Sequence, residues 1–374
     1  MIRLFFTRLI NVPWLMVTAV ATLSLIGALA LYSASQGSWS PWAERHIIRA
    51  IFGGFLMLTI MILPIRLMHQ SAYIIYIGAL LLLIALQVVG FGQGATRWIA
   101  IGPLNFQPSE PAKLAVVLVL ARYFSDRTPE QLQSFLYYIP AFILIALPFA
   151  LVLVQPDLGT SLMIAVGGLI VVFAAGMAYR YILALFVLML GSLPILWSNL
   201  YDYQKQRILT FFNPEDDLLG AGFQITQSKI ALGSGGIFGK GFLMGSQSQL
   251  NYLPEKQTDF VFTMIGEEFG LIGNLFVLGI YFVIFFSILR LTWRVQHRFG
   301  RLICIGVSGF LFLYVFVNVA MVTGIVPVVG VPLPLISYGG TAMLTVFISL
   351  GLVNLMAIHG DLDDDDFSFK SSRR

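Results

Sequence analysis

Several ionisable residues stand at the edges of long apolar segments, where a charge is costly unless it has a partner or a function. Asp259 precedes the apolar run that begins at Phe260, and Thr258 can cap a helix that starts there. A helix N-terminus favours an ionised carboxylate, so Asp259 is a candidate general base at neutral pH. These features alone also fit a carboxylate with a purely structural role.

Glu110 and Lys113, in the sequence QPSEPAK, are three residues apart at the start of another apolar run. On a helix this spacing places both side chains on one face, with Ser109 as the expected N-cap and Pro111 in the first turn. The pair is either an internal ion pair that fixes a short helix or a pair of substrate contacts. Arg97, upstream in the same stretch, is a candidate contact for an anion.

Asp157 lies in QPDLGTSL, a very short turn between two apolar runs. Its carboxylate can cap the helix that follows, because free backbone N–H groups and the helix dipole both favour a negative charge there. A direct contact with substrate is the alternative role for this residue.

The long connection from residue 198 to residue 258 concentrates basic side chains, namely Lys205, Arg207, Lys229, Lys240 and Lys256. It also contains the run GSGGIFGKG, residues 233–241, which imitates a phosphate cradle. The run is not a Walker motif, because Ser234 occupies the first required glycine position and Gly241 follows Lys240. It is therefore either a re-entrant turn or a place where backbone amides and Lys240 approach a pyrophosphate.

Metal-binding residues cannot be named from the sequence. The histidines are scattered and the single cysteine, Cys304, lies inside an apolar run, so neither a zinc site nor a disulfide is indicated. Any metal would be Mg²⁺ or Mn²⁺ held by oxygen ligands beside a pyrophosphate. The adjacent acids Glu267 and Glu268, about two turns beyond Asp259, either line a cavity or pair with a basic side chain.

The composition of the chain indicates what kind of domain holds these residues in place. Of 374 residues, 58% are hydrophobic and 11% charged, and the mean hydropathy is +0.87. Soluble domains carry roughly 25% charged residues, so a water-soluble globule is excluded. The net charge of +4 gives no reason to expect nucleic acid as a partner. We read one membrane domain, residues 1–360, followed by a disordered acidic tail, residues 361–374.

Apolar runs long enough to cross ~30 Å of hydrocarbon recur along the chain and predict an all-α membrane protein of about ten transmembrane helices. The first run is longer than the core of a signal peptide, so we expect it to be retained. The expected spans are residues 12–32, 47–63, 72–89, 111–123, 135–154, 161–177, 182–197, 260–289, 302–323 and 341–358.

Basic residues in short loops predict the orientation, because the cytoplasmic side holds the excess of Lys and Arg. With the N-terminus inside, the cytoplasmic loops contain Arg66, Arg122, Arg127, Arg180, Arg290, Arg294, Arg298 and Arg301. Both termini are then cytoplasmic, and the connection 198–258, between the seventh and eighth spans, is extracytoplasmic. A loop of that length without function is improbable, so we expect re-entrant or interfacial helices in it.

Motifs spread over nearly the whole chain resemble the SEDS family (shape, elongation, division and sporulation). They are TRWIAIGPLNFQPSEPAK, QPDLGTSL, RILTFFNPEDDLLGAGFQITQSKIALGSGGIFGKGF, LPEKQTDFVFTMIGEEFGLIG and PVVGVPLPLISYGGTAML. The segment PLPLISYGG looks more like the elongation branch of the family. Two positions depart from the usual pattern: Gln257 stands where many relatives have His, and Asn251 where Glu is common.

The resemblance implies a peptidoglycan glycosyltransferase of the bacterial cytoplasmic membrane, which polymerises lipid II into glycan strands during cell elongation. It implies a class B penicillin-binding protein as partner, together with other membrane proteins of the elongation machinery. Asp259 matches the essential carboxylate of the family, and Glu110 and Lys113 match a functionally sensitive pair. Any acid or metal role proposed for the family's histidine before the Thr-Asp pair fails here.

The implied reaction is an inverting glycosyl transfer, in which Asp259 takes the proton of the acceptor's GlcNAc 4-hydroxyl as undecaprenyl pyrophosphate leaves the donor. We expect substrate contacts from Arg97, Glu110, Lys113, Asp157, Arg207, Lys229 and Lys240, and a divalent cation, Mg²⁺ or Mn²⁺, with unknown ligands. Two rival classes stay open on the residues alone. They are a lipid II flippase, although no inverted repeat is evident, and a noncatalytic scaffold for a transpeptidase.

Overall fold

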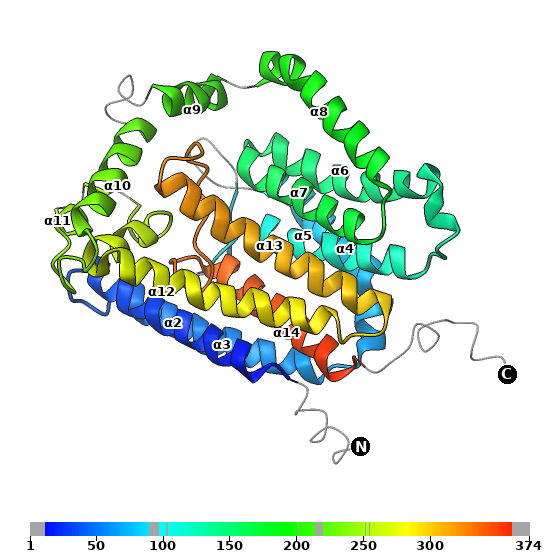
Figure 1. Ribbon diagram of the computed structural model, residues 1–374, viewed down its shortest axis with the longest axis horizontal. Helices are drawn as coiled ribbons and strands as arrows, with labels where there is room; N and C mark the ends of the chain where they lie inside the picture. Colours follow the sequence, from blue (N-terminus) through cyan, green and yellow to red (C-terminus); the bar gives the residue numbers. More distant parts are fainter. Residues whose placement is uncertain are drawn as a thin grey trace.

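The structure, a computed structural model, describes residues 12–89, 97–101, 104–200, 202–213, 220–250, 252–253 and 255–360. These residues form an elongated bundle of helices that run side by side (Figure 1). The predicted acidic tail and the departure at Asn251 lie outside the described residues. The long helices are α2 (Trp14–Ala34), α3 (Trp42–Ile62), α4 (Ile65–Val89), α5 (Ser109–Ser125), α6 (Ile139–Val154), α7 (Leu158–Ala174), α8 (Tyr179–Asn199), α12 (Val261–Thr292), α13 (Arg298–Val322) and α14 (Gly340–Ile358).

The all-α membrane architecture predicted from the apolar runs is confirmed. Among the described residues, seven helices are long and apolar enough to cross a membrane, and each falls on a predicted span. The other three predicted spans are α5 and α7, with 17 residues each, and α8, whose apolar part is shorter. Helix α5 is buried on all sides because α4, α7, α13 and α14 pack around it. It therefore needs no lipid-facing surface of its own.

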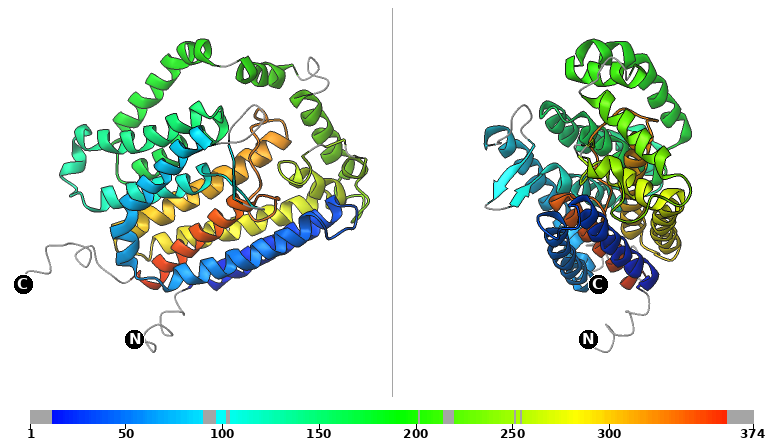
Figure 2. Two further views of the ribbon diagram at one scale, coloured as in Figure 1. Left: turned by 180° about the vertical axis from the view of Figure 1, so that it is seen from behind. Right: turned by 90° about the vertical axis from the view of Figure 1, so that its left-hand side faces the viewer.

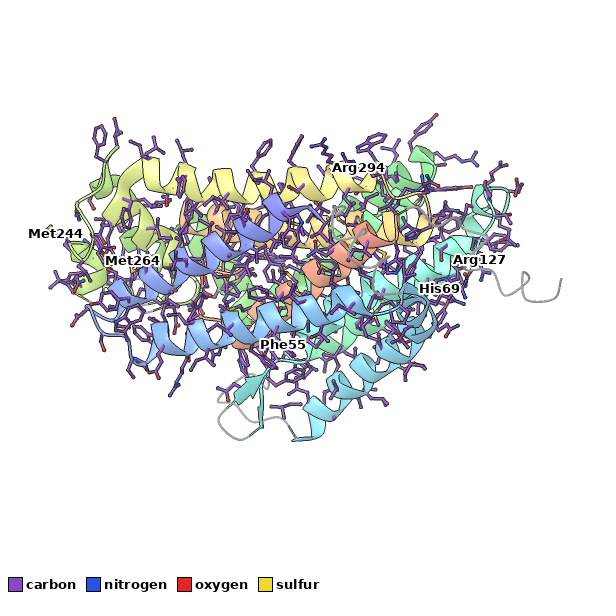
Figure 3. The ribbon with its side chains drawn as sticks, turned by 90° about the horizontal axis from the view of Figure 1, so that it is seen from below. Phe55, His69, Arg127, Met244, Met264 and Arg294 are labelled. Carbon is purple, nitrogen blue, oxygen red and sulfur yellow. The ribbon has the colours of Figure 1, made fainter. Side chains whose placement is uncertain are left out.

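The two ends of the bundle are distinct. Val12, Met61 and Ile358 form one apolar cluster, which places the start of α2 and the ends of α3 and α14 together (Figure 2). We call this the terminal end. The opposite end, called the loop end, carries the connection 198–258, whose Gln249 carbonyl accepts a hydrogen bond from Gln36 at the end of α2. Figure 3 shows Met244 at the loop end and His69 and Arg127 at the terminal end.

The connection 198–258 contains the helices that the sequence predicted for it. These are α9 (Asp202–Phe212), α10 (Ala221–Gly235) and the short α11 (Ser246–Gln249). The glycine run after α10 docks on α12 where that helix is broken at Gly270, which has φ +68°. The amide of Leu271 donates to the Gly236 carbonyl over 2.9 Å, in place of a helical bond. The connection is thus built into the bundle at the loop end.

The sequence did not anticipate a small antiparallel hairpin before α5, formed by β1 (Ile99–Ile101) and β2 (Leu104–Phe106). The Thr341 hydroxyl at the start of α14 accepts from the Gln107 amide and donates to the Asn105 carbonyl. These bonds fix the entry to α5, which begins at the loop end of the bundle.

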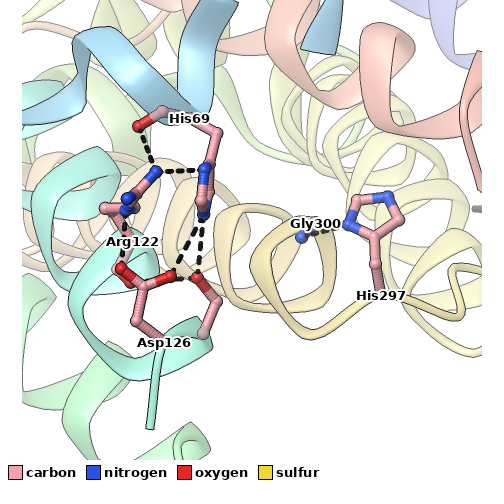
Figure 4. Close-up of polar contacts among 6 residues, drawn as sticks. His69, Arg122, Asp126, His297 and Gly300 are labelled. Carbon is pink, nitrogen blue, oxygen red and sulfur yellow. Dashed lines mark hydrogen bonds and ion pairs between the residues drawn. The ribbon is translucent and has the colours of Figure 1, made fainter. Parts of the chain in front are cut away.

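Polar side chains tie the helices together at the terminal end (Figure 4). Arg122 and Asp126, at the end of α5, form an ion pair of 2.7 Å, and both contact His69 of α4. His297 caps α13 by accepting from the Gly300 amide over 2.9 Å. Burial lowers the pKa of His297 to about 4, so this cap is uncharged at neutral pH.

Candidate active site

Asp259 lies at the loop end, immediately before α12, and its side chain is partly buried. The predicted cap from Thr258 is wrong. The N-cap of α12 is Phe260, and the Thr258 hydroxyl instead donates to the Glu255 carboxylate over 3.0 Å. The backbone turns tightly here, since the amides of residues 258, 259 and 260 all donate to the Glu255 carbonyl.

An irregular segment between α13 and α14 faces the Asp259 carboxylate. Gly330 in this segment has φ +80°, and a methyl group on its Cα would lie 3.4 Å from the Asp259 Oδ2. The segment is held from several sides. The Tyr338 amide donates to the Gln257 carbonyl over 2.8 Å, and the Tyr281 hydroxyl donates to the Pro334 carbonyl. Irregular backbone at membrane depth is tolerated when protein partners satisfy it in this way.

Asn318 of α13, which the sequence reading did not single out, joins these two segments. Its Nδ2 donates to the Asp259 carbonyl over 2.9 Å and to the Val331 carbonyl over 2.7 Å, and the residue is fully buried. The sequence did contain one signal for it, because Asn318 is a polar residue inside the apolar run 302–323. The sequence alone could not say which groups this amide would meet.

The surroundings raise the pKa of Asp259 to about 6. Burial is the largest cause, and the negative charge of Glu255 adds to it. The positive charge of Arg207 and the hydrogen bond from Thr258 act in the opposite direction. A carboxylate with this pKa is ionised at neutral pH and more basic than an exposed aspartate, which suits a general base.

A cavity of about 250 Å³ at the loop end gathers three of the predicted substrate contacts: Arg97, Asp157 and Arg207. Residues 327–329, which precede Gly330, form another part of its wall. Arg207 on α9 donates to the Val328 carbonyl over 3.3 Å. The wall segment that meets Arg207 therefore continues directly to the Asp259 carboxylate.

Within this cavity, Asp157 caps α7 as predicted. Its carboxylate accepts from the Thr160 amide over 3.2 Å and from the Thr160 hydroxyl over 2.9 Å. The Nε of Arg97 lies 3.7 Å from Asp157 Oδ2, and the guanidinium also donates to the Pro156 carbonyl. Asp157 therefore both caps α7 and lines the cavity, and its carboxylate is engaged by Thr160 and Arg97.

Glu110 and Lys113 do not line this cavity. They are buried in the helix core, with Lys113 Nζ 2.8 Å from Glu110 Oε1, and the Tyr314 hydroxyl contacts both side chains. The predicted Ser109 cap is wrong, because the helix already includes Ser109 and the N-cap is Pro108, whose φ and ψ are helical. Tyr314 lies one helical turn before Asn318, so this cluster supports the helix that holds Asp259 in place.

Lys240 and Lys229 have other neighbours. Lys240 Nζ lies 2.7 Å from Glu267 Oε1, and Glu267 also accepts from the Gln247 and Ser248 amides that begin α11. Glu267 therefore pairs with a basic residue, one of the two roles expected for it. Glu268 accepts a hydrogen bond from Ser33 of α2. The end of the Lys229 side chain, its Cε and Nζ, lies over Gly324.

No three His, Cys, Asp or Glu side chains gather among the described residues in a way that could hold a metal ion. A divalent cation that arrives with substrate phosphates stays a prediction, and no step below depends on it.

The fold and site define a class: a polytopic membrane protein with a basic carboxylate at one end, next to an arginine-lined cavity. The chain belongs to the family of cell cycle proteins FtsW, RodA and SpoVE, which it matches over residues 9–361.

Curated relatives support this assignment. The chain is 44% identical over 347 residues to the peptidoglycan glycosyltransferase MrdB of Escherichia coli, an alignment that covers 92% of each chain. It is 32% identical to the peptidoglycan glycosyltransferase RodA of Treponema pallidum, with 92% of this chain and 97% of that protein covered.

Solved structures agree. A chain of a peptidoglycan synthase complex that coordinates polymerization and crosslinking matches with a TM-score of 0.81 at 32% identity, covering 94% of this chain and 99% of that one. The crystal structure of the rod shape determining protein RodA of Thermus thermophilus matches with a TM-score of 0.70 at 29% identity, covering 94% and 98%.

Proposed function

We propose that this chain polymerises lipid II into glycan strands on the outer face of the cytoplasmic membrane, with Asp259 as the general base. Membership of the family and 44% identity to MrdB over most of both chains make it a peptidoglycan glycosyltransferase. The observation that carries the choice of base is the Asp259 carboxylate, whose raised pKa and place beside an arginine-lined cavity fit proton abstraction.

In this mechanism, Asp259 accepts the proton of the acceptor's 4-hydroxyl as that oxygen attacks the anomeric carbon of the donor. The bond from the anomeric carbon to the pyrophosphate breaks, and the configuration at that carbon inverts. Arg97 and Arg207 line the cavity with positive charge that stabilises the departing pyrophosphate. Because the leaving group is already stable as an anion, no second carboxylate is needed to protonate it.

This proposal requires the loop end to face the outside, as the basic loops predict. A substituted-cysteine experiment checks it in Cys304→Ser protein in intact cells. A membrane-impermeant thiol reagent should label Lys205→Cys in α9 and not Arg294→Cys at the terminal end. Labelling of Arg294→Cys alone would show that the terminal end faces outside, and the proposed site would then lie on the wrong side of the membrane for its substrate.

The central test is polymerisation of labelled lipid II by the purified protein with its partner. Asp259→Asn should remove the product while the protein keeps its thermal stability in detergent. Gln257→Ala is the matched control, since it removes a nearby side chain that bonds to Glu255 and leaves the Asp259 carboxylate in place. Retained polymerisation by Asp259→Asn would show that another group removes the proton.

We also propose that the membrane helix of a class B penicillin-binding protein docks on an apolar groove between α12 and α13. The groove has a volume of about 330 Å³ and is lined by Leu278, Tyr281, Phe282, Phe285, Phe312, Val315, Phe316, Val319, Ala320 and Ile325. Val319→Trp should fill it and reduce co-purification of the partner. Ile74→Trp, on the exposed side of α4, is the control. Equal recovery of partner by both variants would place the docking surface elsewhere.

A further inference from the structure

We infer that Asn318 is a positioning residue, which fixes the general base relative to the wall of the substrate cavity. It does so by donating hydrogen bonds to the Asp259 carbonyl and to the Val331 carbonyl. The inference rests on the proposed role of Asp259. Among the described residues, Asn318 does not line the cavity, and its hydrogen bonds go to backbone carbonyls, so we infer that it acts through the backbone that it binds.

The geometry is specific to an amide. One Nδ2 supplies both hydrogens, at 2.9 Å to the Asp259 carbonyl and 2.7 Å to the Val331 carbonyl. A serine has a single hydrogen to donate and a leucine has none. The Oδ1 of Asn318 is buried and accepts no hydrogen bond from the residues that the structure describes, so the side chain acts there through its two donors.

The two carbonyls belong to segments that are far apart in the sequence. Asp259 ends the connection that contains α9 to α11, whereas Val331 continues the segment 327–330 that lines the cavity and abuts the carboxylate. One backbone bond also joins the two segments, from the Tyr338 amide to the Gln257 carbonyl, but it lies seven residues beyond Val331. Asn318 binds the two segments at Asp259 itself and does so from a regular helix, so it sets the distance between the carboxylate and the cavity wall.

Removing the amide leaves two buried carbonyls unsatisfied, and the irregular segment can relieve this only by moving toward water. The carboxylate then gains solvent. Since burial is the main cause of its raised pKa, the pKa should fall from about 6 toward the ordinary value for aspartate, about 4. The base is ionised over a wider pH range but is weaker and misplaced.

The experiment measures lipid II polymerisation against pH for wild type, Asn318→Leu and Asn318→Gln, each with its partner. For Asn318→Leu we expect kcat to fall about 10- to 100-fold with KM nearly unchanged, and the midpoint of the acid limb to move below the wild-type value. Asn318→Gln keeps the amide and should recover part of both. A role in stability alone would lower the amount of folded protein without moving the midpoint.

The matched control is Asn354→Leu. Asn354 is also fully buried, on α14, and its side-chain nitrogen and oxygen form no hydrogen bond among the described residues. It should keep the wild-type rate and midpoint. If Asn318→Leu does not fold, Asn318→Gln decides the question alone. Its longer side chain displaces the two carbonyls, and this should move the midpoint of the acid limb.

Two failures can be separated. If wild type makes no polymer, or Asp259→Asn keeps making it, the proposed function fails. If wild type is active, Asp259→Asn is inactive and the Asn318 variants show the wild-type midpoint and kcat, the positioning role is refuted while the enzyme assignment stands.

Discussion

The chain contains two carboxylates near membrane depth whose surroundings differ. Glu110 is enclosed by Lys113 and Tyr314, and its charge is matched inside the protein. No Lys, Arg or His of the described residues lies within ion-pair distance of Asp259, whose pKa rises to about 6 mainly through burial. The first carboxylate is held in a buried ion pair, whereas the second has a raised pKa and is placed to accept a proton. Burial alone therefore does not identify the catalytic carboxylate in this fold.

The largest expected effect is the loss of activity without loss of stability at Asp259. Asp259→Asn should reduce lipid II polymerisation by about 10²- to 10⁴-fold, the usual contribution of a general base, because an amide cannot accept the proton. Its melting temperature in detergent should match that of wild type. A large drop in melting temperature would make Asp259 a structural residue like Glu110 and end the contrast between them.

The opposite pattern is expected at the buried pair. Glu110→Ala leaves the Lys113 ammonium uncompensated and should destabilise the protein by about 3–5 kcal/mol. Glu110→Ala combined with Lys113→Met should be more stable than the single variant, and exchanging the two residues should recover some activity. Thermal unfolding and polymerisation are measured together. Normal stability of Glu110→Ala with lost activity would indicate a direct contact with substrate.

A smaller effect is expected on the pH dependence. The base must be ionised, so activity should rise with pH through a midpoint near the Asp259 pKa, about 6. Glu255→Gln removes a nearby negative charge, lowers this pKa and moves the midpoint down. Arg207→Gln removes a positive charge, raises the pKa and moves the midpoint up. Initial rates between pH 5 and 8 measure both midpoints. Each midpoint should move by less than about one pH unit, because Glu255 and Arg207 are exposed. Shifts of the same sign in both variants would contradict this electrostatic account.

The smallest effect is expected at Lys240. Its ion pair with Glu267 is partly exposed, and Glu267 keeps its backbone hydrogen bonds without it. Lys240→Met should cost about 1 kcal/mol of stability or less and leave polymerisation within about threefold of wild type. A large rise in KM for lipid II would instead support the anion contact predicted from the glycine run.

The sequence predicted the helices and their order because continuous apolar runs of about 20 residues cross a membrane as helices, which satisfy their own backbone hydrogen bonds. It also predicted the Asp157 cap, since that bond joins residues three apart. It missed Asn318, the small hairpin and the break at Gly270. Two of these depend on groups far apart in the chain: the Asn318 amide meets a carbonyl 59 residues away, and at the break the Leu271 amide meets the Gly236 carbonyl. The hairpin pairs nearby residues, but its strands have three residues each, too few for a clear alternation of apolar and polar side chains. The placement of Arg97, Asp157 and Arg207 around one cavity likewise became visible only in three dimensions.

The break in α12 has a consequence for sequence variation. Gly270 combines φ +68° with ψ −163°, a conformation that side chains exclude, and a methyl group there would lie 2.4 Å from the Gly239 amide nitrogen. A methyl group on Gly239 would in turn meet the Glu268 carbonyl at 2.1 Å. In a saturation library selected for growth, these two codons should tolerate no other amino acid, although neither encodes a residue that meets the sugar.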